Sequence, residues 1–369
     1  MKDLHSMKIS AVDTMLLSIP YRATGGLHRI AGQASPGLNM LLVRVQTDEG
    51  IVGWGEAFGH AVAHGTKTVI DTIIGPLLIG RDPRDISGVM TDLQRKLHLF
   101  GRSGPVIYAL SGIDIALWDI AGKIAGLPIY RLLGGSRVEE LTVYSSFLRC
   151  TDTDAVADCC IVALEQGFRY VKLHEIDVAS VRAARAALGP DVEIMLDTNC
   201  PWSVAEAIAM TKALEKFRLY WLEEPVWPPD DHAGLARVRA AGAFTSAGEN
   251  ASGLHDFLHL FQCGALDVAQ PSVAKIGGIT EVRKIIALAE AYGVRVVPHC
   301  GYLGPGYLAT LHLVASMPGG ELMERLNMDL EANLFGHYTD TLKARAPVPQ
   351  GPGLGCDPDI ADVEHFRIL

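Results

Sequence analysis

The sequence lacks two features that would each indicate a different class of protein. Basic residues are not in excess, because 32 Lys and Arg stand against 42 Asp and Glu, for a formal net charge of −10. This balance argues against a nucleic-acid partner, whose binding depends on a positive field. No apolar run reaches the length of about 18 residues that spans a membrane, and the N-terminal MKDLHSMKIS has no apolar signal core. We therefore expect no membrane association.

Cysteine gives no sign of a disulfide framework. The chain has seven cysteines, which is an odd number, and no two of them have CxxC spacing. This pattern argues against a disulfide-rich secreted domain and fits reduced thiols in a cytoplasm. We expect a cytoplasmic protein.

What the chain does contain is enough apolar material for a large core. Its 369 residues are 49% hydrophobic, a length that suits two domains or one large α/β barrel with an appendage. Residues 8–60 have the pattern of strands and turns, including two β-rich runs joined by Asp48-Glu49-Gly50. Residues 108–125 have helical periodicity, and Gly134-Gly135 follows them. The first 135 residues therefore predict an α+β domain.

From residue 142 onward, short β-rich runs alternate with amphipathic helical segments such as 203–217 and 279–291. An open doubly wound sheet is the alternative, but no GxGxxG fingerprint follows any of the strands. Eight such units in one stretch predict an α/β fold of the TIM-barrel type. The eight runs are LTVYSS, YVKLH, EIMLD, LYWLEE, AFTSAGE, LDVAQ, VRVVPH and ELMERL.

Polar residues recur near the ends of these strands, at a spacing close to one βα unit of about 25 residues. Active sites of such barrels are built at the carboxyl ends of the strands, so these side chains should share one site. The residues in question are Lys172, His174, Asp197, Glu223, Glu249, Ser272, His299 and Glu324.

Three of these residues are carboxylates on adjacent strands: Asp197, Glu223 and Glu249. Converging carboxylates repel each other unless a cation joins them, and ligands that are all oxygen favour Mg²⁺, with Mn²⁺ possible. Lys172 and His174 point to one side of their strand, and His299 ends a strand across the mouth. Bases around a metal-held carboxylate suit removal of its α-proton through an enediolate.

With these motifs, the chain resembles the mandelate racemase/muconate lactonizing enzyme family of the enolase superfamily. The motifs that carry the resemblance are ALSGIDIALWDIAGKIAGLPIYRLLGG, VKLHE, MLDTNCPW, WLEEP, GEN, KIGGIT and VPHCGYLGPG. The resemblance implies a capping domain over residues 1–135, completed by 345–369, and a modified (β/α)7β barrel over 136–344. It also implies that Asp197, Glu223 and Glu249 bind Mg²⁺ and that Glu324 hydrogen-bonds the substrate carboxylate in a protonated form. Homo-oligomers, as dimers or octamers, are common among such proteins.

Two positions depart from the family pattern. Lys172-Leu173-His174 stands where the family often has Lys-x-Lys, so His174 becomes a candidate base and Lys172 its electrostatic partner. Ser272 stands where the racemase group has an Asp that pairs with His299. A serine orients the imidazole more weakly than an Asp, which suits His299 as a general acid. We expect Lys275 to be structural.

Four further residues are candidates for substrate binding. Asn199 points the same way as Asp197, and Tyr144 ends the first barrel strand, where core packing is the alternative. His28 and Arg29 lie at the position of the family's specificity loop, where Arg29 is a candidate clamp for a distal carboxylate.

Together these features predict a Mg²⁺-dependent lyase that dehydrates a small hydroxy acid such as a sugar acid by β-elimination of water. The catalytic candidates are Lys172, His174, His299 and Glu324. Either His174 or His299 takes the α-proton, and the metal with Lys172 and Glu324 stabilises the enediolate. A racemase or epimerase, or a cycloisomerase of a lactone or anhydro-sugar acid, would use the same intermediate. A barrel that binds a metabolite without chemistry is the alternative from another class.

Overall fold

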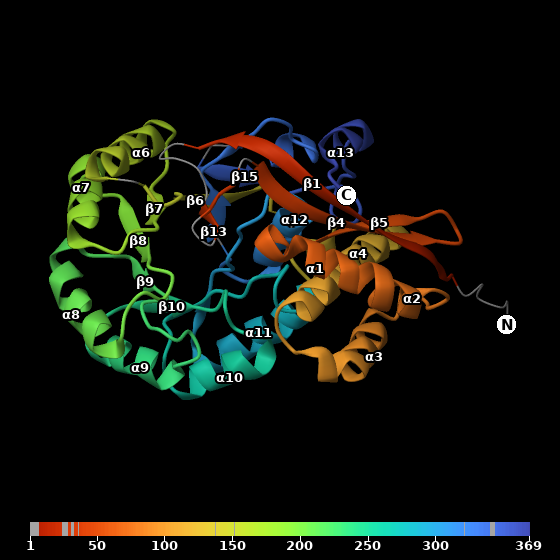
Figure 1. Cartoon of the computed structure of the whole chain (residues 1–369), viewed down its shortest axis with the longest axis horizontal. Coiled ribbons are helices and arrows are strands. Elements are labelled where there is room, and N and C mark those ends of the chain that lie inside the picture. Colours follow the sequence, from red (N-terminus) through yellow and green to blue (C-terminus); the bar gives the residue numbers. More distant parts are fainter. Residues whose placement is uncertain are drawn as a thin grey trace.

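The computed structural model of the protein shows a ring of strands and helices beside a smaller sheet and helix layer (Figure 1). It gives only the main chain of residues 29–30 and 33–34. It describes all the rest of the chain except residues 1–6, 24–28, 31–32, 36, 137, 151, 321 and 340–343.

The N-terminal part is built on an antiparallel sheet with the strand order β14-β1-β4-β5. Its strands are β1 (Ile9–Arg22), β4 (Gly37–Thr47), β5 (Val52–Ala57) and β14 (Asp329–Leu330). The predicted hairpin joins β4 to β5, and its Gly50 has a φ of 81°, which glycine adopts without strain. Two short strands, β2 (Arg29–Ile30) and β3 (Gln33–Ala34), pair separately.

Helices cover one face of this sheet, and α4 lies directly on β5. The approach is close because Gly55 has no side chain: a Cβ there would lie 2.0 Å from the Gly112 carbonyl oxygen. The helices are α1 (Ala63–Val69), α2 (Gly75–Leu78), α3 (Ile86–Leu97), α4 (Pro105–Ala125) and α5 (Ile129–Leu132), with short turns η1 (His60–Val62), η2 (Ile70–Ile74) and η3 (His98–Phe100).

One helix of the described chain, α4, is long and apolar enough to cross a membrane by length and composition alone. Its most apolar window is 72% buried inside the protein, between β5 and α11. Such burial is what a core helix requires.

The second part is a parallel sheet of eight strands that match the eight predicted runs. Its order is β12-β11-β10-β9-β8-β7-β6-β13, and every neighbouring pair in that path is parallel. The strands are β6 (Glu140–Ser146), β7 (Tyr170–Leu173), β8 (Glu193–Asp197), β9 (Trp221–Glu223), β10 (Thr245–Ala247), β11 (Val268–Ala269), β12 (Arg295–Val296) and β13 (Leu322–Leu326).

A helix connects each of these strands to the next, which confirms the predicted α/β barrel and its (β/α)7β pattern. The helices lie outside the ring of strands (Figure 1). They are α6 (Thr153–Glu165), α7 (Val178–Leu188), α8 (Val204–Leu214, extended by η4, Glu215–Phe217), α9 (His232–Ala240), α10 (Leu254–Gln262), α11 (Gly278–Tyr292) and α12 (Pro305–Ser316).

After the barrel, the chain returns to both parts of the molecule. It continues through η5 (Gly336–Tyr338), β15 (Arg345–Pro347) and α13 (Ile360–Phe366). Strand β15 pairs with β6 of the barrel, whereas Leu16 of β1 donates its N–H to the carbonyl of Leu369 at 2.9 Å. The last residues therefore extend the N-terminal sheet.

The two parts meet above the carboxyl ends of the barrel strands. Glu56 of β5 accepts the N–H of Gly306 at the start of α12 at 2.9 Å, and Phe58 donates its N–H to the carbonyl of Ala274 at 3.2 Å. The N-terminal part therefore covers the barrel end where the predicted site lies.

Candidate active site

Lys172 lies at the centre of the site. It is fully buried on β7, and its Nζ lies 2.7 Å from Glu324 Oε1, 3.1 Å from Glu223 Oε1 and 3.3 Å from Asp197 Oδ2. Burial would lower the pKa of Lys172, but attraction to Glu223 and Glu324 outweighs it and holds the pKa well above its ordinary value. The side chain is therefore a permanent cation.

Asp197 and Glu223 are neighbours because strand register places them opposite each other at the ends of β8 and β9. Asp197 Oδ1 accepts hydrogen bonds at 3.0 Å from both nitrogens of Asn199. Glu223 Oε2 accepts from Trp221 Nε1 and Gln270 Nε2, both at 2.9 Å. These hydrogen bonds fix the orientation of both carboxylates.

Burial and the charge of Asp197 raise the pKa of Glu223 well above its ordinary value. For Asp197, Lys172 and His174 outweigh the effect of burial and lower the pKa. The single positive charge of Lys172 therefore does not neutralise both Asp197 and Glu223.

His174 lies just beyond β7, between a main-chain carbonyl and a carboxylate. Its Nδ1 lies 2.5 Å from the carbonyl oxygen of Phe147, and its Nε2 lies 3.1 Å from Asp197 Oδ2. A carbonyl can only accept, so Nδ1 keeps its proton. Nε2 is therefore the nitrogen that can gain or lose one.

His299 lies beyond β12 and contacts Glu249 instead. Its Nε2 is 2.8 Å from Glu249 Oε2, and its Nδ1 is 2.9 Å from the hydroxyl of Ser272. Ser272 thus occupies the orienting position that the sequence suggested.

Lys275, which we expected to be structural, lies beside one of the site carboxylates. Its Nζ lies 3.9 Å from Glu249 Oε1 and 4.9 Å from the centre of the Phe58 ring. Burial would raise the pKa of Glu249, but Lys275 and His299 outweigh it and hold the pKa well below its ordinary value. Lys275 therefore supplies charge to the site.

Glu324 faces Lys172 from β13, and its second oxygen accepts the N–H of Cys300 at 2.8 Å. Burial would raise the pKa of Glu324, but Lys172 and His299 outweigh it and lower the pKa to about 2. The carboxylate is ionised beside Lys172, and the protonated form expected with bound substrate would need a change in this contact.

The carboxylates predicted to bind a metal turn toward nitrogens in this structure. Asp197 and Glu223 contact Lys172, and Glu249 contacts His299. Across the described residues, no group of three or more His, Cys, Asp or Glu side chains is arranged around one point as a metal site. Buried carboxylates repel each other. Each of them therefore turns away from its neighbours and toward a positive or neutral hydrogen-bond donor.

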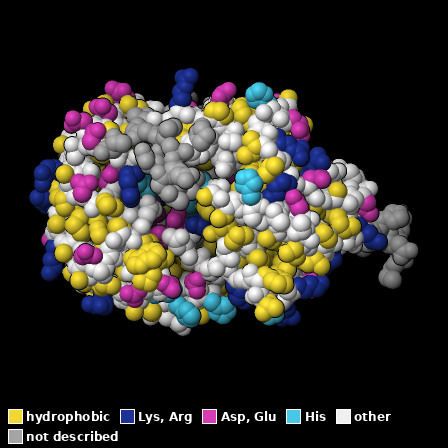
Figure 2. All heavy atoms as spheres, viewed as in Figure 1, with side chains coloured by type: hydrophobic (Ala, Val, Ile, Leu, Met, Phe, Trp, Pro, Cys, Tyr) yellow, Lys and Arg dark blue, Asp and Glu magenta, His cyan; other side chains and the backbone are white. Residues whose placement is uncertain are grey.

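The donor set nevertheless fits a divalent cation. Glu224, which follows Glu223, is also buried, and its pKa rises to about 8 through burial and the charges of Glu249 and Asp197. Two lysines and two imidazoles face five carboxyl groups, and the raised pKa values of Glu223 and Glu224 show that these cations do not compensate all five when they are ionised. The five are Asp197, Glu223, Glu224, Glu249 and Glu324. Figure 2 shows acidic side chains within a hollow near the centre of this face.

Tyr144 lies in the barrel interior and not at its mouth. It is fully buried among apolar side chains, and its ring packs edge-on against Trp221 with centroids 5.7 Å apart. This position fits the alternative of core packing, and the ring also lies 5.8 Å from Lys172 Nζ. His28 and the side chain of Arg29 lie outside the described residues.

Sequence reasoning missed several residues that orient this site. Gln270 ends the run LDVAQ, so its strand-end position was a signal. No sequence signal indicated the carbonyl of Phe147 or the hydroxyl of Tyr302, which bonds Ser272. Both groups reach the site from loops, where no periodic pattern fixes their direction.

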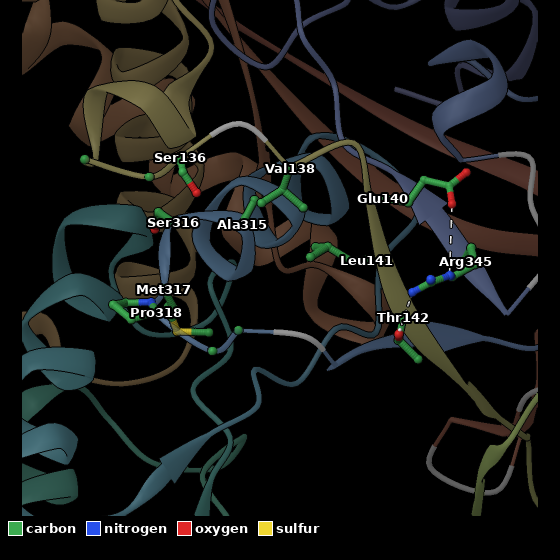
Figure 3. A pocket seen from close by; sticks show the side chains of 14 residues that line it. Ser136, Val138, Glu140, Leu141, Thr142, Ala315, Ser316, Met317, Pro318 and Arg345 are labelled. Carbon is green, nitrogen blue, oxygen red and sulfur yellow. Dashed lines mark hydrogen bonds and ion pairs between the residues drawn. The ribbon is translucent and has the colours of Figure 1, made fainter.

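A cavity of substantial size lies elsewhere among the described residues. It has a volume of about 690 Å³ and lies between the start of β6 and the C-terminal end of α12, lined in part by Leu141, Thr142 and Met317 (Figure 3). Lys172 pairs with Ser146 at the opposite end of β6. The cavity is therefore separate from the carboxylate cluster.

Comparison with known proteins agrees with this geometry. The family description "Enolase C-terminal domain-like" matches residues 155–363, and "Mandelate racemase / muconate lactonizing enzyme, N-terminal domain" matches residues 27–134. The chain belongs to the mandelate racemase/muconate lactonizing enzyme family of the enolase superfamily. The resemblance inferred from its motifs is thus confirmed.

The relatives of this enolase-superfamily chain are named as enzymes. It is 34% identical to D-galactarolactone cycloisomerase of Agrobacterium fabrum, over 98% of this chain and 99% of the relative. It is 31% identical to arabinonate dehydratase of Saccharolobus solfataricus, over 88% of this chain and 90% of the relative. The solved structure of 3,6-anhydro-D-galactonate cycloisomerase from Zobellia galactanivorans matches 98% of this chain and 100% of its own, with 31% identity and a TM-score of 0.87. The prediction of an enzyme of the lyase or isomerase type is confirmed, and nothing here favours a barrel without chemistry.

Proposed function

We propose that this enzyme removes the α-proton of a sugar-acid carboxylate and then eliminates water from the β-carbon. The observation that carries the proposal is the pair of imidazoles around the Lys172 cluster. His174 contacts Asp197 at 3.1 Å and His299 contacts Glu249 at 2.8 Å, from strands β7 and β12 that lie far apart in the sheet order. A substrate between them would meet an acid–base group on each side.

In this proposal His174 is the base. Because the Phe147 carbonyl holds the proton of Nδ1, Nε2 takes the α-proton, and the C–H electron pair moves into the carboxylate to form an enediolate. That electron pair then forms the C=C bond to the β-carbon as the β C–O bond breaks. The departing hydroxyl leaves as water with a proton from His299 or His174, and the enol product tautomerises to a 2-oxo acid. Lys172 would stabilise the negative charge that develops on the substrate.

The proposed cofactor is Mg²⁺, with Mn²⁺ possible, held by Asp197, Glu223 and Glu249. A bound divalent cation would withdraw charge from the substrate carboxylate and make the α-proton more acidic. Supporting this, the donors are all carboxylate oxygens, and the buried acids outnumber the nearby cations. Titration calorimetry should detect Mg²⁺ binding that Glu249→Gln weakens strongly. Equal binding by Glu249→Gln would contradict the assignment.

Cycloisomerisation is the second candidate. It is favoured by the near full-length likeness to two cycloisomerases, one of them a solved structure. The same base would act, but the leaving group would be a ring oxygen of a lactone or anhydro sugar acid. The product then keeps every atom of the substrate, so mass spectrometry separates it from dehydration.

A substrate screen tests the proposal. The purified protein with Mg²⁺ is incubated with aldonates, aldarates and their lactones, and products are followed by proton NMR and mass spectrometry. We expect a 2-oxo product that has lost one water. His174→Asn should abolish it, whereas His255→Asn, an exposed histidine on α10, should not.

The proposal fails if the wild-type protein with Mg²⁺ transforms none of these compounds. It also fails if His174→Asn retains the wild-type rate. A product of unchanged mass would instead favour cycloisomerisation.

We also propose that the protein is a cytoplasmic homo-oligomer. Supporting assembly, two consecutive apolar side chains after α3, Leu99 and Phe100, are 79% and 63% exposed. Light scattering coupled to size exclusion should give a mass above the 39.7 kDa of one chain. A monomer mass would contradict this.

A further inference from the structure

We propose that Tyr302, acting through Ser272, holds a proton on Nε2 of His299, so that His299 faces the substrate as a hydrogen-bond donor and not as a second base. This inference rests on the proposed function, in which His174 is the base. It makes Tyr302 a positioning residue, since its hydroxyl reaches the site only through Ser272.

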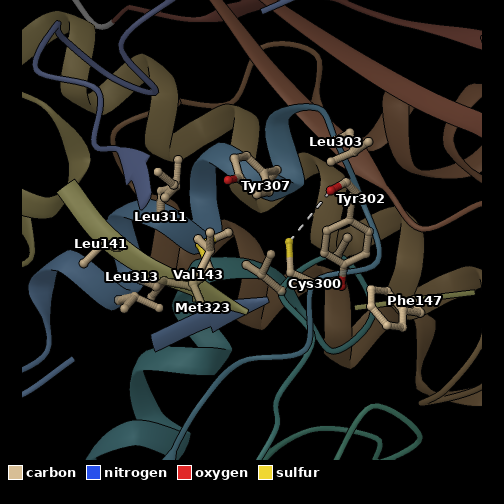
Figure 4. Close-up of a cluster of buried hydrophobic side chains, with 14 of the residues drawn as sticks. Leu141, Val143, Phe147, Cys300, Tyr302, Leu303, Tyr307, Leu311, Leu313 and Met323 are labelled. Atoms are coloured by element: carbon tan, nitrogen blue, oxygen red, sulfur yellow. Dashed lines mark hydrogen bonds between the residues drawn. The ribbon is translucent and has the colours of Figure 1, made fainter. Parts of the chain in front are cut away.

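The three side chains form a buried chain of hydrogen bonds. The Tyr302 hydroxyl bonds Ser272 Oγ, and Ser272 Oγ lies 2.9 Å from His299 Nδ1. Ser272 is fully buried, Tyr302 is 2% exposed and His299 is 8% exposed. Figure 4 shows Tyr302 within the hydrophobic cluster, near Cys300.

The available donors and acceptors fix the direction in which the hydrogen bonds run between Tyr302, Ser272 and His299. If His299 Nδ1 donated to Ser272, the Ser272 hydrogen would go to Tyr302, and the Tyr302 hydrogen would need a further acceptor. Within the described part of the chain, Ser272 is the one side-chain partner of this hydroxyl, and the main chain of Ala274 bonds it in the sense of an N–H donor. That direction would leave a buried hydroxyl hydrogen unpaired, which is costly.

The opposite direction satisfies every group. Tyr302 donates to Ser272, Ser272 donates to Nδ1, and Nδ1 accepts with its lone pair. The proton of the neutral ring then lies on Nε2. The same atom keeps a proton when the ring is fully protonated, so in both states Nε2 is a donor.

The contact on the other side of the ring is compatible with this direction. Nε2 lies 2.8 Å from Glu249 Oε2, and an ionised carboxylate can only accept. Ser272 acts at Nδ1 from the opposite side, so its effect does not require Glu249 to stay in this position.

His174 is held in the opposite way. The Phe147 carbonyl accepts from its Nδ1, which leaves Nε2 as the basic nitrogen of the neutral ring. The two neutral rings are therefore not equivalent, because His174 has its lone pair on Nε2 and His299 has its proton there. In this structure both Nε2 atoms face a carboxylate, Asp197 at 3.1 Å for His174 and Glu249 at 2.8 Å for His299, so the difference comes from the partners of Nδ1. This arrangement suits elimination or cycloisomerisation with one base, and it opposes racemisation, which needs an exchangeable base on each face.

The tautomer can be measured directly. Protein with ¹⁵N-labelled histidine is examined by long-range ¹H–¹⁵N NMR at a pH where the rings are neutral, and His299→Gln identifies the signal. We expect the His299 proton on Nε2, both with and without Mg²⁺. In Tyr302→Phe and Ser272→Ala, a form protonated on Nδ1 should appear.

Tyr307→Phe is the matched control. Tyr307 is fully buried in the same cluster, and its hydroxyl has no hydrogen-bond partner among the described residues. Removing that hydroxyl should leave the His299 tautomer unchanged. A wild-type proton on Nδ1, an unchanged tautomer in Tyr302→Phe, or a tautomer that changes when Mg²⁺ is added would each overturn the proposal. This measurement needs no substrate, so its result is independent of the proposed reaction.

Kinetics then test the role of the tautomer. With any substrate found, Tyr302→Phe should lower kcat by about tenfold, the effect of one lost hydrogen bond, and change KM little. Tyr307→Phe should change neither. An unchanged kcat in Tyr302→Phe would overturn the link to the reaction.

Discussion

At the residue scale, the site depends on the position of Lys172. It is a fully buried cation within 3.3 Å of three carboxylates. Removing one partner of a buried ion pair is costly because the remaining charges stay buried. The same charge that supports the fold would also stabilise the substrate anion.

Lys172→Met should therefore lower the free energy of unfolding by about 3–5 kcal/mol, the usual cost of breaking a buried ion pair. Lys212→Met, an exposed lysine on α8, is the control and should change it little. Urea unfolding measures both. Equal stability of Lys172→Met and the wild type would contradict the charge arrangement described here.

The direction of site residues on strands could be predicted from the sequence, whereas that of Lys275 in a loop could not. Lys172, Asp197, Glu223 and Glu324 occupy strands, where alternation fixes the direction of each side chain. Lys275 lies in a loop whose path is set by packing against the N-terminal part of the chain, and no spacing rule reveals that its ammonium turns back to Glu249.

At the element scale, the strands of the barrel were predictable because β-rich runs and helical segments alternate without interruption. The pairing of β14 with β1 was not, because it joins residues 329–330 to 21–22 through two short segments. The contact between β5 and α4 was also hidden, since it depends on glycines whose close approach is visible only in three dimensions.

Gly55→Ala tests that contact. The new Cβ would lie 2.0 Å from the Gly112 carbonyl oxygen, so α4 must move away from β5. Overpacking of this kind costs about 1–3 kcal/mol. Gly65→Ala, at an exposed position in α1 with open space around it, should instead stabilise by about 0.5–1 kcal/mol. Thermal unfolding that moved both variants in the same direction would contradict this packing.

At the scale of the whole molecule, Glu56 connects the N-terminal part to the barrel. It is buried, and burial raises its pKa to about 7 although the N–H groups of Gly306 and Gly304 oppose the rise. Between the ordinary pKa of 4.5 and about 7, the folded protein holds a proton that the unfolded chain has released. Stability from this group is therefore full below that window and is lost as the pH rises through it.

Glu56→Gln should remove this dependence. Relative to the variant, the wild type should lose about 3 kcal/mol of unfolding free energy between pH values below and above that window. Glu49→Gln, an exposed residue of the β4–β5 turn, is the control and should follow the wild type. Urea unfolding at several pH values measures the difference. A constant gap between wild type and Glu56→Gln would show that Glu56 does not titrate in this way.

The central claim is that His174 is the one base that removes the α-proton. Its most direct test is deuterium incorporation at the α-carbon, followed by proton NMR in D₂O with Mg²⁺ and a substrate from the screen. We predict that His299→Asn still exchanges the α-proton and that His174→Asn does not. Exchange that survives in His174→Asn and is lost in His299→Asn would contradict the account.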